Sequence, residues 1–186
     1  MDKSRRVQRD PKKGPTHPPL VNDQMVDREF DIIIRRWFGN IARVLLSGRG
    51  FYIWGGYGNC GRYPPALKAC ELHFSQAIIW VKEHPVLTRK DFMGNHEWCF
   101  YGWREGAAHV FLGTNNATDV WSVKKVNPQS MIHLTEKPVE LAARAMQYSS
   151  RPGENVLDLF AGSGSTLIAA EQTGRRAFLM ELDSLY

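Results

Sequence analysis

The clearest pattern of apolar and polar positions lies in residues 155–183. An apolar run at 156–159 is typical of a buried parallel strand, and a glycine-rich turn follows it. The next residues predict a helix that ends at Gly174, where a glycine can adopt the left-handed backbone. Residues 177–182 predict a second strand, so the segment reads as strand, turn, helix and strand. The residues expected to cap the helix are Ser163, Ser165 and Thr166.

Helical and strand periods alternate in the rest of the chain as well. Apolar residues at helical spacing predict a long helix that begins shortly after residue 22. Because helices and strands alternate, the sequence predicts an α/β domain with a parallel, doubly wound sheet. The apolar positions of the long helix are Phe30, Ile33, Ile34, Trp37, Ile41, Val44 and Leu45. The other expected elements are strands at 51–54, 74–81 and 95–103, helices at 64–72 and 138–149, and loops at 82–95 and 104–130.

The positive charge of the chain is concentrated near its N-terminus. Of the net charge of +5, most comes from residues 1–13, where six basic residues face two acids. Residues 1–21 are also rich in proline and have no apolar period, so they predict a disordered, basic, Pro-rich arm. Such an arm is either a solvated tail or a segment that binds phosphate groups.

The overall composition predicts one intracellular domain. A chain of 186 residues, 43% of them hydrophobic, can bury a single core. The three cysteines have no Cys-x-x-Cys spacing, which favours reduced and mostly buried thiols. The sequence has no apolar run of membrane-spanning length and no signal peptide, so we expect a cytoplasmic protein without membrane association.

The glycine-rich turn carries the first candidate chemistry. Gly162 and Gly164 lack Cβ atoms, so backbone N–H groups there can approach a ligand closely. Glu181 and Asp183 follow about twenty residues later, at the end of the next strand, where an acid accepts hydrogen bonds from ribose hydroxyls. A phosphate-binding P-loop is disfavoured because no lysine follows the second glycine, and a dinucleotide fold because Leu167 replaces the third glycine. The pattern predicts a cofactor that contains adenosine.

Other candidate groups allow more than one interpretation. Thr135, Glu136 and Lys137 precede a helix, where they either bind a zwitterionic amino acid or belong to an ordinary capped helix. The aromatic residues of 95–103 either stack on a base or pack in the core. His96 and Glu97 lack a third ligand at metal-binding spacing, so no metal site is expected.

Two motifs lie in the C-terminal half of the sequence. The first is His133-x-Thr135-x-Lys137-Pro138, and the second is Asp158-x-Phe160-x-Gly162-Ser163-Gly164-Ser165-Thr166. Together they resemble those of a known family, the DNA amino-methyltransferases that modify adenine N6 or cytosine N4. Their order is similar to that of the circularly permuted class, in which the glycine motif comes late. The resemblance extends over residues 22–186, which it identifies as a Rossmann-like methyltransferase domain. It divides them into a target-side half, 22–130, and a cofactor-binding half, 131–186.

The resemblance implies S-adenosylmethionine as the cofactor. Thr135 and Lys137 would lie near its methionine end, and Glu181 would bind its ribose hydroxyls. The substrate would be double-stranded DNA with the target base flipped out of the stack, because the amine cannot be reached inside the duplex. Methyl transfer would then be a direct displacement from the sulfonium, helped by orientation. The remaining residues that the resemblance assigns to the cofactor site are Asp158, Phe160, Gly162, Gly164 and Thr166.

The chain departs from the family at its catalytic motif, (Asp/Asn/Ser)-Pro-Pro-(Tyr/Phe/Trp), which should lie upstream of residue 22. His17-Pro18-Pro19-Leu20 has neither the polar acceptor nor the aromatic residue, so the catalytic residues are unknown. In the family the motif follows a strand between those that end here at Trp54 and Leu159, so we expect an incomplete sheet and a truncated member. An adenine-N6 methyltransferase is the favoured function. A non-catalytic remnant that binds cofactor or DNA is the main alternative, and N4-cytosine, RNA and protein methyltransferases are lesser ones.

Overall fold

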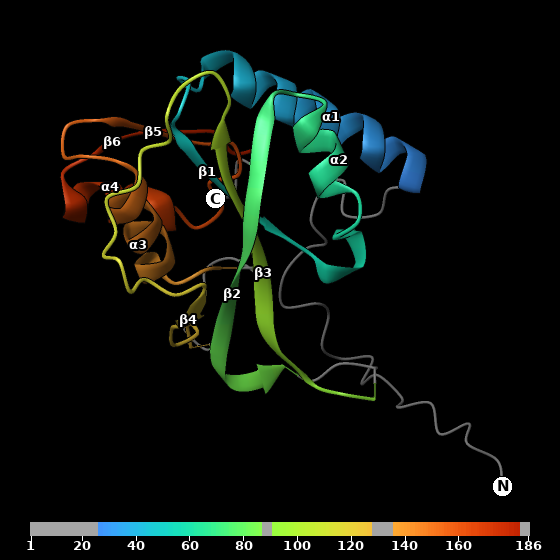
Figure 1. Cartoon of the computed structure of the whole chain (residues 1–186). Helices are drawn as coiled ribbons and strands as arrows, with labels where there is room; N and C mark the ends of the chain where they lie inside the picture. Colours follow the sequence, from blue (N-terminus) through green and yellow to red (C-terminus); the bar gives the residue numbers. More distant parts are fainter. Residues whose placement is uncertain (1–25, 87–90, 128–135, 183–186) are drawn as a thin grey trace, which may run out of the picture.

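The computed structural model describes residues 26–86, 91–127 and 136–182, which form a mixed α/β domain (Figure 1). The predicted N-terminal arm, residues 1–21, lies outside these ranges, as do Thr135 and Asp183. In chain order the elements are α1 (Asp27–Val44), β1 (Gly50–Gly55), the 3-10 turn η1 (Tyr57–Asn59), α2 (Tyr63–Lys68), β2 (Leu72–Val86), β3 (Gly94–Arg104), β4 (Val120–Ser122), α3 (Val139–Ser149), β5 (Asn155–Asp158), α4 (Ser165–Thr173) and β6 (Arg176–Leu179).

Helix α1 confirms the helical period of the sequence. Its buried residues are Ile34, Phe38 and Ala42, of which only Ile34 was among the expected apolar positions, and they pack against β1, β3 and α2. Acidic residues in its first turn and Arg43 in its last turn favour the helix dipole. Val44 was expected on the buried face but is 57% exposed, because the helix ends at that residue.

Four strands form a mixed sheet in the order β1-β3-β2-β4. In this sheet, strand β3 is antiparallel to both β1 and β2, whereas β2 and β4 pair in parallel. The expectation of a parallel sheet was therefore wrong for this part of the chain. β2 and β3 form one long hairpin, which leaves no room for the helical crossover that parallel strands need. Residues 82–86 and 94–95 of the expected loop 82–95 belong to these two strands, and their mostly polar sequence gave no apolar alternation.

Helices cover both faces of the four-stranded sheet. On one face, α1 and α2 bury Leu67, Leu72 and Phe100. On the other face, α3 packs through Leu141 against Trp80 and Trp121, all at most 2% exposed. Phe100 and Tyr101 of β3 are buried in these two clusters, and Trp98 and Trp103 pack against them, which supports packing over base stacking for these aromatic residues.

The cysteines are unpaired, as the sequence predicted. Cys99 is fully buried, and burial raises the pKa of its thiol far above the usual value. Cys60 and Cys70 are only half-buried, so the expectation of mostly buried thiols holds for Cys99 alone.

The C-terminal strands form a second sheet. β5 and β6 pair in parallel, with Asn155 opposite Arg176 and Asp158 opposite Leu179. α3 and α4 cover one face of this pair around Met146, Ala169 and Ala170. Within the described ranges, β1 pairs only with β3, and β5 only with β6. The domain therefore has two separate sheets, as expected of a fold with an incomplete sheet, while its α/β class agrees with the sequence.

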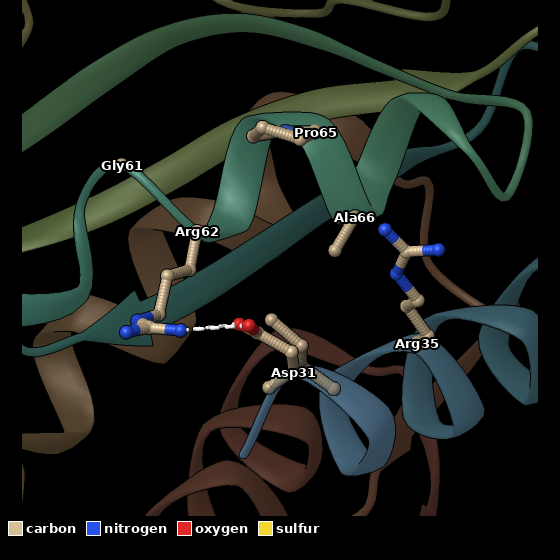
Figure 2. A pocket seen from close by; sticks show the side chains of 7 residues that line it. Asp31, Arg35, Gly61, Arg62, Pro65 and Ala66 are labelled. Carbon is tan, nitrogen blue, oxygen red and sulfur yellow. Dashed lines mark hydrogen bonds and ion pairs between the residues drawn. The ribbon is translucent and has the colours of Figure 1, made fainter. Parts of the chain in front are cut away.

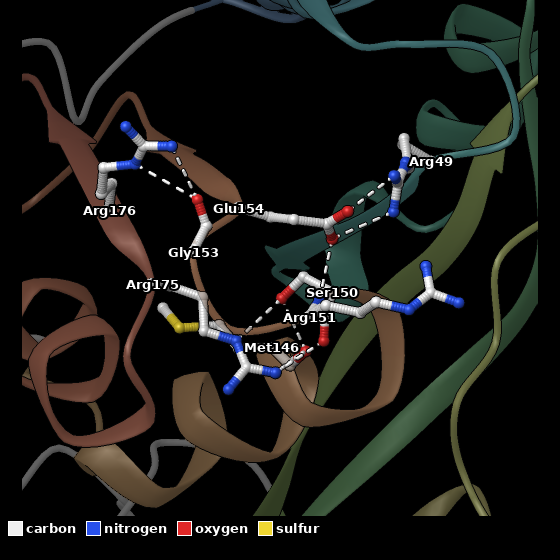
Figure 3. A network of polar contacts seen from close by, with 8 residues as sticks. All are labelled: Arg49, Met146, Ser150, Arg151, Gly153, Glu154, Arg175 and Arg176. Carbon is white, nitrogen blue, oxygen red and sulfur yellow. Dashed lines mark hydrogen bonds and ion pairs between the residues drawn. The ribbon is translucent and has the colours of Figure 1, made fainter.

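A polar network joins the residues that directly precede β1 and β5, one strand from each sheet. Arg49, directly before β1, donates two hydrogen bonds to Glu154, directly before β5, at 3.0 and 2.7 Å. Glu154 also accepts a hydrogen bond from the Arg151 amide at 2.8 Å. Figure 3 shows Arg175 and Arg176 on the other side of the same turn, where they donate to the carbonyl oxygens of Ser150 and Gly153. These contacts fix the connection between α3 and β5.

Candidate functional site

The glycine-rich turn lies at the carboxyl end of β5, between this strand and α4. Gly162 and Gly164 have φ angles of +50° and +79°, a backbone region that side chains disfavour. Gly164 is itself the N-cap of α4, with no side-chain cap, so the capping expected from Ser163, Ser165 or Thr166 was wrong. Gly174 ends the helix with φ +70°, as predicted.

Asp158 shapes this turn from within. One of its carboxylate oxygens accepts a hydrogen bond from the Phe160 amide at 2.9 Å. The other accepts one from the Thr166 hydroxyl at 2.6 Å. Asp158 and Thr166 thereby tie the end of β5 to the first turn of α4, which explains why an acid and a hydroxyl residue flank the glycines.

Glu181 connects the end of β6 to the same turn. β6 ends at Leu179, earlier than expected, so Glu181 lies in the segment that follows the strand. Its carboxylate accepts hydrogen bonds from the amides of Gly162 and Leu182, both at 2.8 Å. An acidic group is thus held beside the glycine turn, at the edge where α/β sheets bind ligands.

Exposed apolar side chains lie in the same two segments as this acid and the glycine turn. Phe160, Met180 and Leu182 are 59%, 60% and 73% exposed. Phe160 also packs edge-on against Trp37 of α1, with ring centroids 4.8 Å apart. A Cβ atom at Gly164 would meet no other atom within 4 Å, so the turn borders open space. A carboxylate beside exposed apolar groups and an open glycine turn fits an adenosine, which combines ribose hydroxyls with an apolar ring.

Lys137 forms an ion pair with a residue of the four-stranded sheet, Glu97. Its ammonium lies 3.5 Å from Glu97 of β3, and the other oxygen of Glu97 lies 2.7 Å from Lys82 of β2. Burial alone would raise the pKa of Glu97, but the two ammonium groups outweigh burial and lower it below the usual value. The sequence analysis considered Glu97 as a metal-ligand candidate and did not connect it with Lys82 or Lys137, since nothing in the sequence links these three positions.

The structure thus brings together most of the predicted cofactor residues. Asp158, Phe160, Gly162, Gly164, Thr166 and Glu181 gather at the carboxyl ends of β5 and β6. Lys137 contacts β3, and Thr135 lies outside the described residues. Sequence reasoning missed the contact between Trp37 and Phe160, because the two residues come from opposite ends of the chain.

Other surface features offer less chemistry. A cavity between α1 and α2 is lined partly by Asp31, Arg35 and Arg62. Figure 2 shows Asp31 and Arg62 pointing at each other, and their 2.7 Å ion pair leaves the cavity without a free carboxylate there.

Across the three described ranges, no group of three His, Cys, Asp or Glu side chains could hold a metal ion. No helix in this part of the chain is both long and apolar enough to cross a membrane.

The fold and the glycine turn define an α/β domain of the methyltransferase kind. The chain belongs to the DNA methylase family of N6 and N4 methyltransferases, whose model matches residues 22–186. This family uses S-adenosylmethionine as its methyl donor. A curated relative, the type II methyltransferase M.HinfI of Haemophilus influenzae, is 24% identical over 85% of this chain. The chain spans 49% of the length of that relative, about half.

Solved structures share the fold at low sequence identity. The M1.HpyAVI complex with S-adenosylmethionine is 21% identical, with a TM-score of 0.76 over 87% of this chain and 81% of that one. The putative DNA modification methylase TTHA0409 of Thermus thermophilus is 23% identical, with a TM-score of 0.69 over 86% and 75%. The cytosine-N4-specific PvuII DNA methyltransferase is 15% identical, with a TM-score of 0.66 over 89% and 73%.

Proposed function

We propose that this chain binds S-adenosylmethionine at the glycine turn and serves the methylation of adenine N6 in double-stranded DNA. The main observation in favour of cofactor binding is the position of the Glu181 carboxylate. It lies 2.8 Å from the Gly162 amide, beside an open turn. The family match and the solved complexes of two relatives with S-adenosylmethionine support the same cofactor.

The residues of the turn have distinct roles in this proposal. Glu181 accepts hydrogen bonds from the ribose hydroxyls, and Phe160 covers one side of the adenine ring. Asp158 and Thr166 hold the turn in shape from behind. Gly162 and Gly164 allow the backbone to approach the ligand. Thr135 and Lys137 lie near the methionine end of the bound cofactor. The bound cofactor supplies a methyl group on a positively charged sulfur.

DNA is the proposed partner, through the target-side half of residues 22–130. An exocyclic amine takes part in base pairing within a duplex, so the base must leave the stack before a methyl group can reach it. Adenine is proposed over cytosine on the family preference. The N-terminal arm, residues 1–21, is proposed to contribute phosphate contacts through its basic residues.

A second candidate function is cofactor binding without catalysis. The residues described contain no (Asp/Asn/Ser)-Pro-Pro-(Tyr/Phe/Trp) motif, and β1 and β5 pair on one side only within these ranges. These observations favour a chain that binds the cofactor and depends on further protein for transfer.

Two measurements test the proposal. Calorimetry should detect S-adenosylmethionine binding to the chain, with Asp158→Ala much weaker. Absence of binding, or equal binding by this variant, would contradict the proposed site. Incubation with methyl-labelled cofactor and DNA, followed by chromatography of the nucleosides, should detect N6-methyladenine. Label in N4-methylcytosine, RNA or protein would assign another substrate, and binding without label would favour the second candidate.

A further inference from the structure

Three charged side chains from separate parts of the chain meet on one face of the β2–β3 hairpin. Glu97 accepts from Lys82 at 2.7 Å through one oxygen and lies 3.5 Å from the Lys137 ammonium through the other. Trp80 pairs with Glu97 in the register of the two strands, so Glu97, Trp80 and Lys82 share the face that α3 covers. One carboxylate between two ammonium groups leaves a surplus positive charge.

The two lysines differ in how firmly they are held. The Lys82 side chain is only 9% exposed, and its ammonium lies 5.1 Å from the centroid of the buried Trp80 ring. Lys137 is 27% exposed and has the longer contact with Glu97. A desolvated charge needs a close partner, and Lys82 has one in Glu97. Lys82 therefore anchors the carboxylate, and the carboxylate in turn fixes the direction of the Lys137 ammonium.

The position of Lys137 favours an anion as its further partner. It comes two residues before α3, whose N-terminus carries a partial positive charge. An ammonium has three donors, of which Glu97 takes one. The surplus charge and the helix N-terminus both favour an anionic group at this place.

We propose that Glu97 is a positioning residue, which holds the Lys137 ammonium for the carboxylate of the methionine moiety of S-adenosylmethionine. Lys82 keeps Glu97 in place. The inference rests on the proposed cofactor function and adds the two groups that orient its methionine end. Glu97 and Lys82 do not touch the reacting atoms.

The test compares two ligands that differ in the amino acid. S-adenosylhomocysteine carries both the adenosine and the amino-acid carboxylate, whereas 5′-methylthioadenosine carries the adenosine alone. By calorimetry with the full chain, Glu97→Gln should weaken S-adenosylhomocysteine about tenfold, the scale of one hydrogen bond to a charged group. It should leave 5′-methylthioadenosine unchanged. The matched control is Glu83→Gln, whose partner Lys124 is 83% exposed at 3.5 Å, and it should change neither affinity.

A double-mutant cycle tests whether Glu97 acts through Lys137. Once Lys137→Met has removed the ammonium, Glu97→Gln should have no further effect on S-adenosylhomocysteine. Equal weakening of both ligands would mean a general packing role and overturn the inference, as would additive effects, unchanged affinity or tighter binding in Glu97→Gln. A wild-type chain that binds neither ligand would overturn the proposed function itself, and the inference with it.

Discussion

The carboxylate of Asp158 and the hydroxyl of Thr166 meet behind the glycine turn, 2.6 Å apart. The same carboxylate holds the Phe160 amide. The chain therefore fixes the shape of the turn with its own groups, and a ligand need not order it. Pre-organisation of this kind lowers the entropy cost of binding.

We expect Thr166→Val to weaken S-adenosylmethionine binding about fivefold to thirtyfold. The substitution keeps the shape of the side chain but leaves one Asp158 oxygen without its donor, a loss of about 1–2 kcal/mol. Calorimetry measures the affinity, and urea unfolding measures the stability. Thr166→Ser keeps the hydroxyl and should behave like the wild type, so equal defects in the two variants would contradict this role.

Glu181→Gln should weaken S-adenosylmethionine and 5′-methylthioadenosine to the same extent, about tenfold. Both ligands carry the ribose whose hydroxyls the carboxylate accepts, and a charged acceptor binds more strongly than an amide. This pattern differs from the one expected for Glu97→Gln, which should leave the affinity for 5′-methylthioadenosine unchanged. Glu171→Gln on the exposed side of α4 is the control. A selective loss of one ligand in Glu181→Gln would refute the ribose assignment.

The ion pair between Arg49 and Glu154 should make stability depend on pH. The Arg151 amide and the Arg49 guanidinium lower the pKa of Glu154 in the folded chain. A lowered folded pKa contributes stability above the unfolded pKa of about 4.3, and this contribution disappears as pH falls through the folded value.

Glu154→Gln is therefore expected to cost about 1 kcal/mol at pH 7, the scale of a well-formed surface pair. The difference from the wild type should shrink below about pH 4, where the wild-type carboxylate also becomes protonated. Urea unfolding at several pH values measures it. A difference that stays constant with pH would mean that packing, and not charge, links the two sheets here.

Leu141→Ala should destabilise the domain by about 2–5 kcal/mol, the range for a buried leucine. Leu141 is 1% exposed and packs α3 against the core around Trp80 and Trp121. Leu46→Ala, at a residue 68% exposed, should change the unfolding free energy by less than about 0.5 kcal/mol. Comparable losses in the two variants would show that α3 does not depend on this contact.

Local patterns in the sequence predicted much of this fold. The helical spacing of Ile34 and Trp37 and the glycine at the end of α4 depend on neighbouring residues alone, so they could be predicted directly. The glycine motif and the acid that follows it by about twenty residues predicted which residues would gather at the turn after β5.

Features that depend on distant residues could not be predicted in this way. The antiparallel direction of β3 depends on the hairpin that joins it to β2, whose polar outer part has no apolar period. Arg49 and Glu154 are separated by 105 positions, and the three charges around Glu97 come from separate elements. Ion pairs of this kind leave no local signal, because charged residues at the surface are common everywhere.

The single-sided pairing of β1 and β5 has a consequence for how amide protons exchange with solvent. Within the described residues, β3 lies between two partners, so its amides should be the slowest to exchange. Half of the amides of β1 and β5 point away from their one partner strand, and these should exchange fast unless another strand covers them. The experiment can be repeated after a further polypeptide segment is added to the chain. If that segment slows the exchange of only these amides, it is the strand that completes the fold.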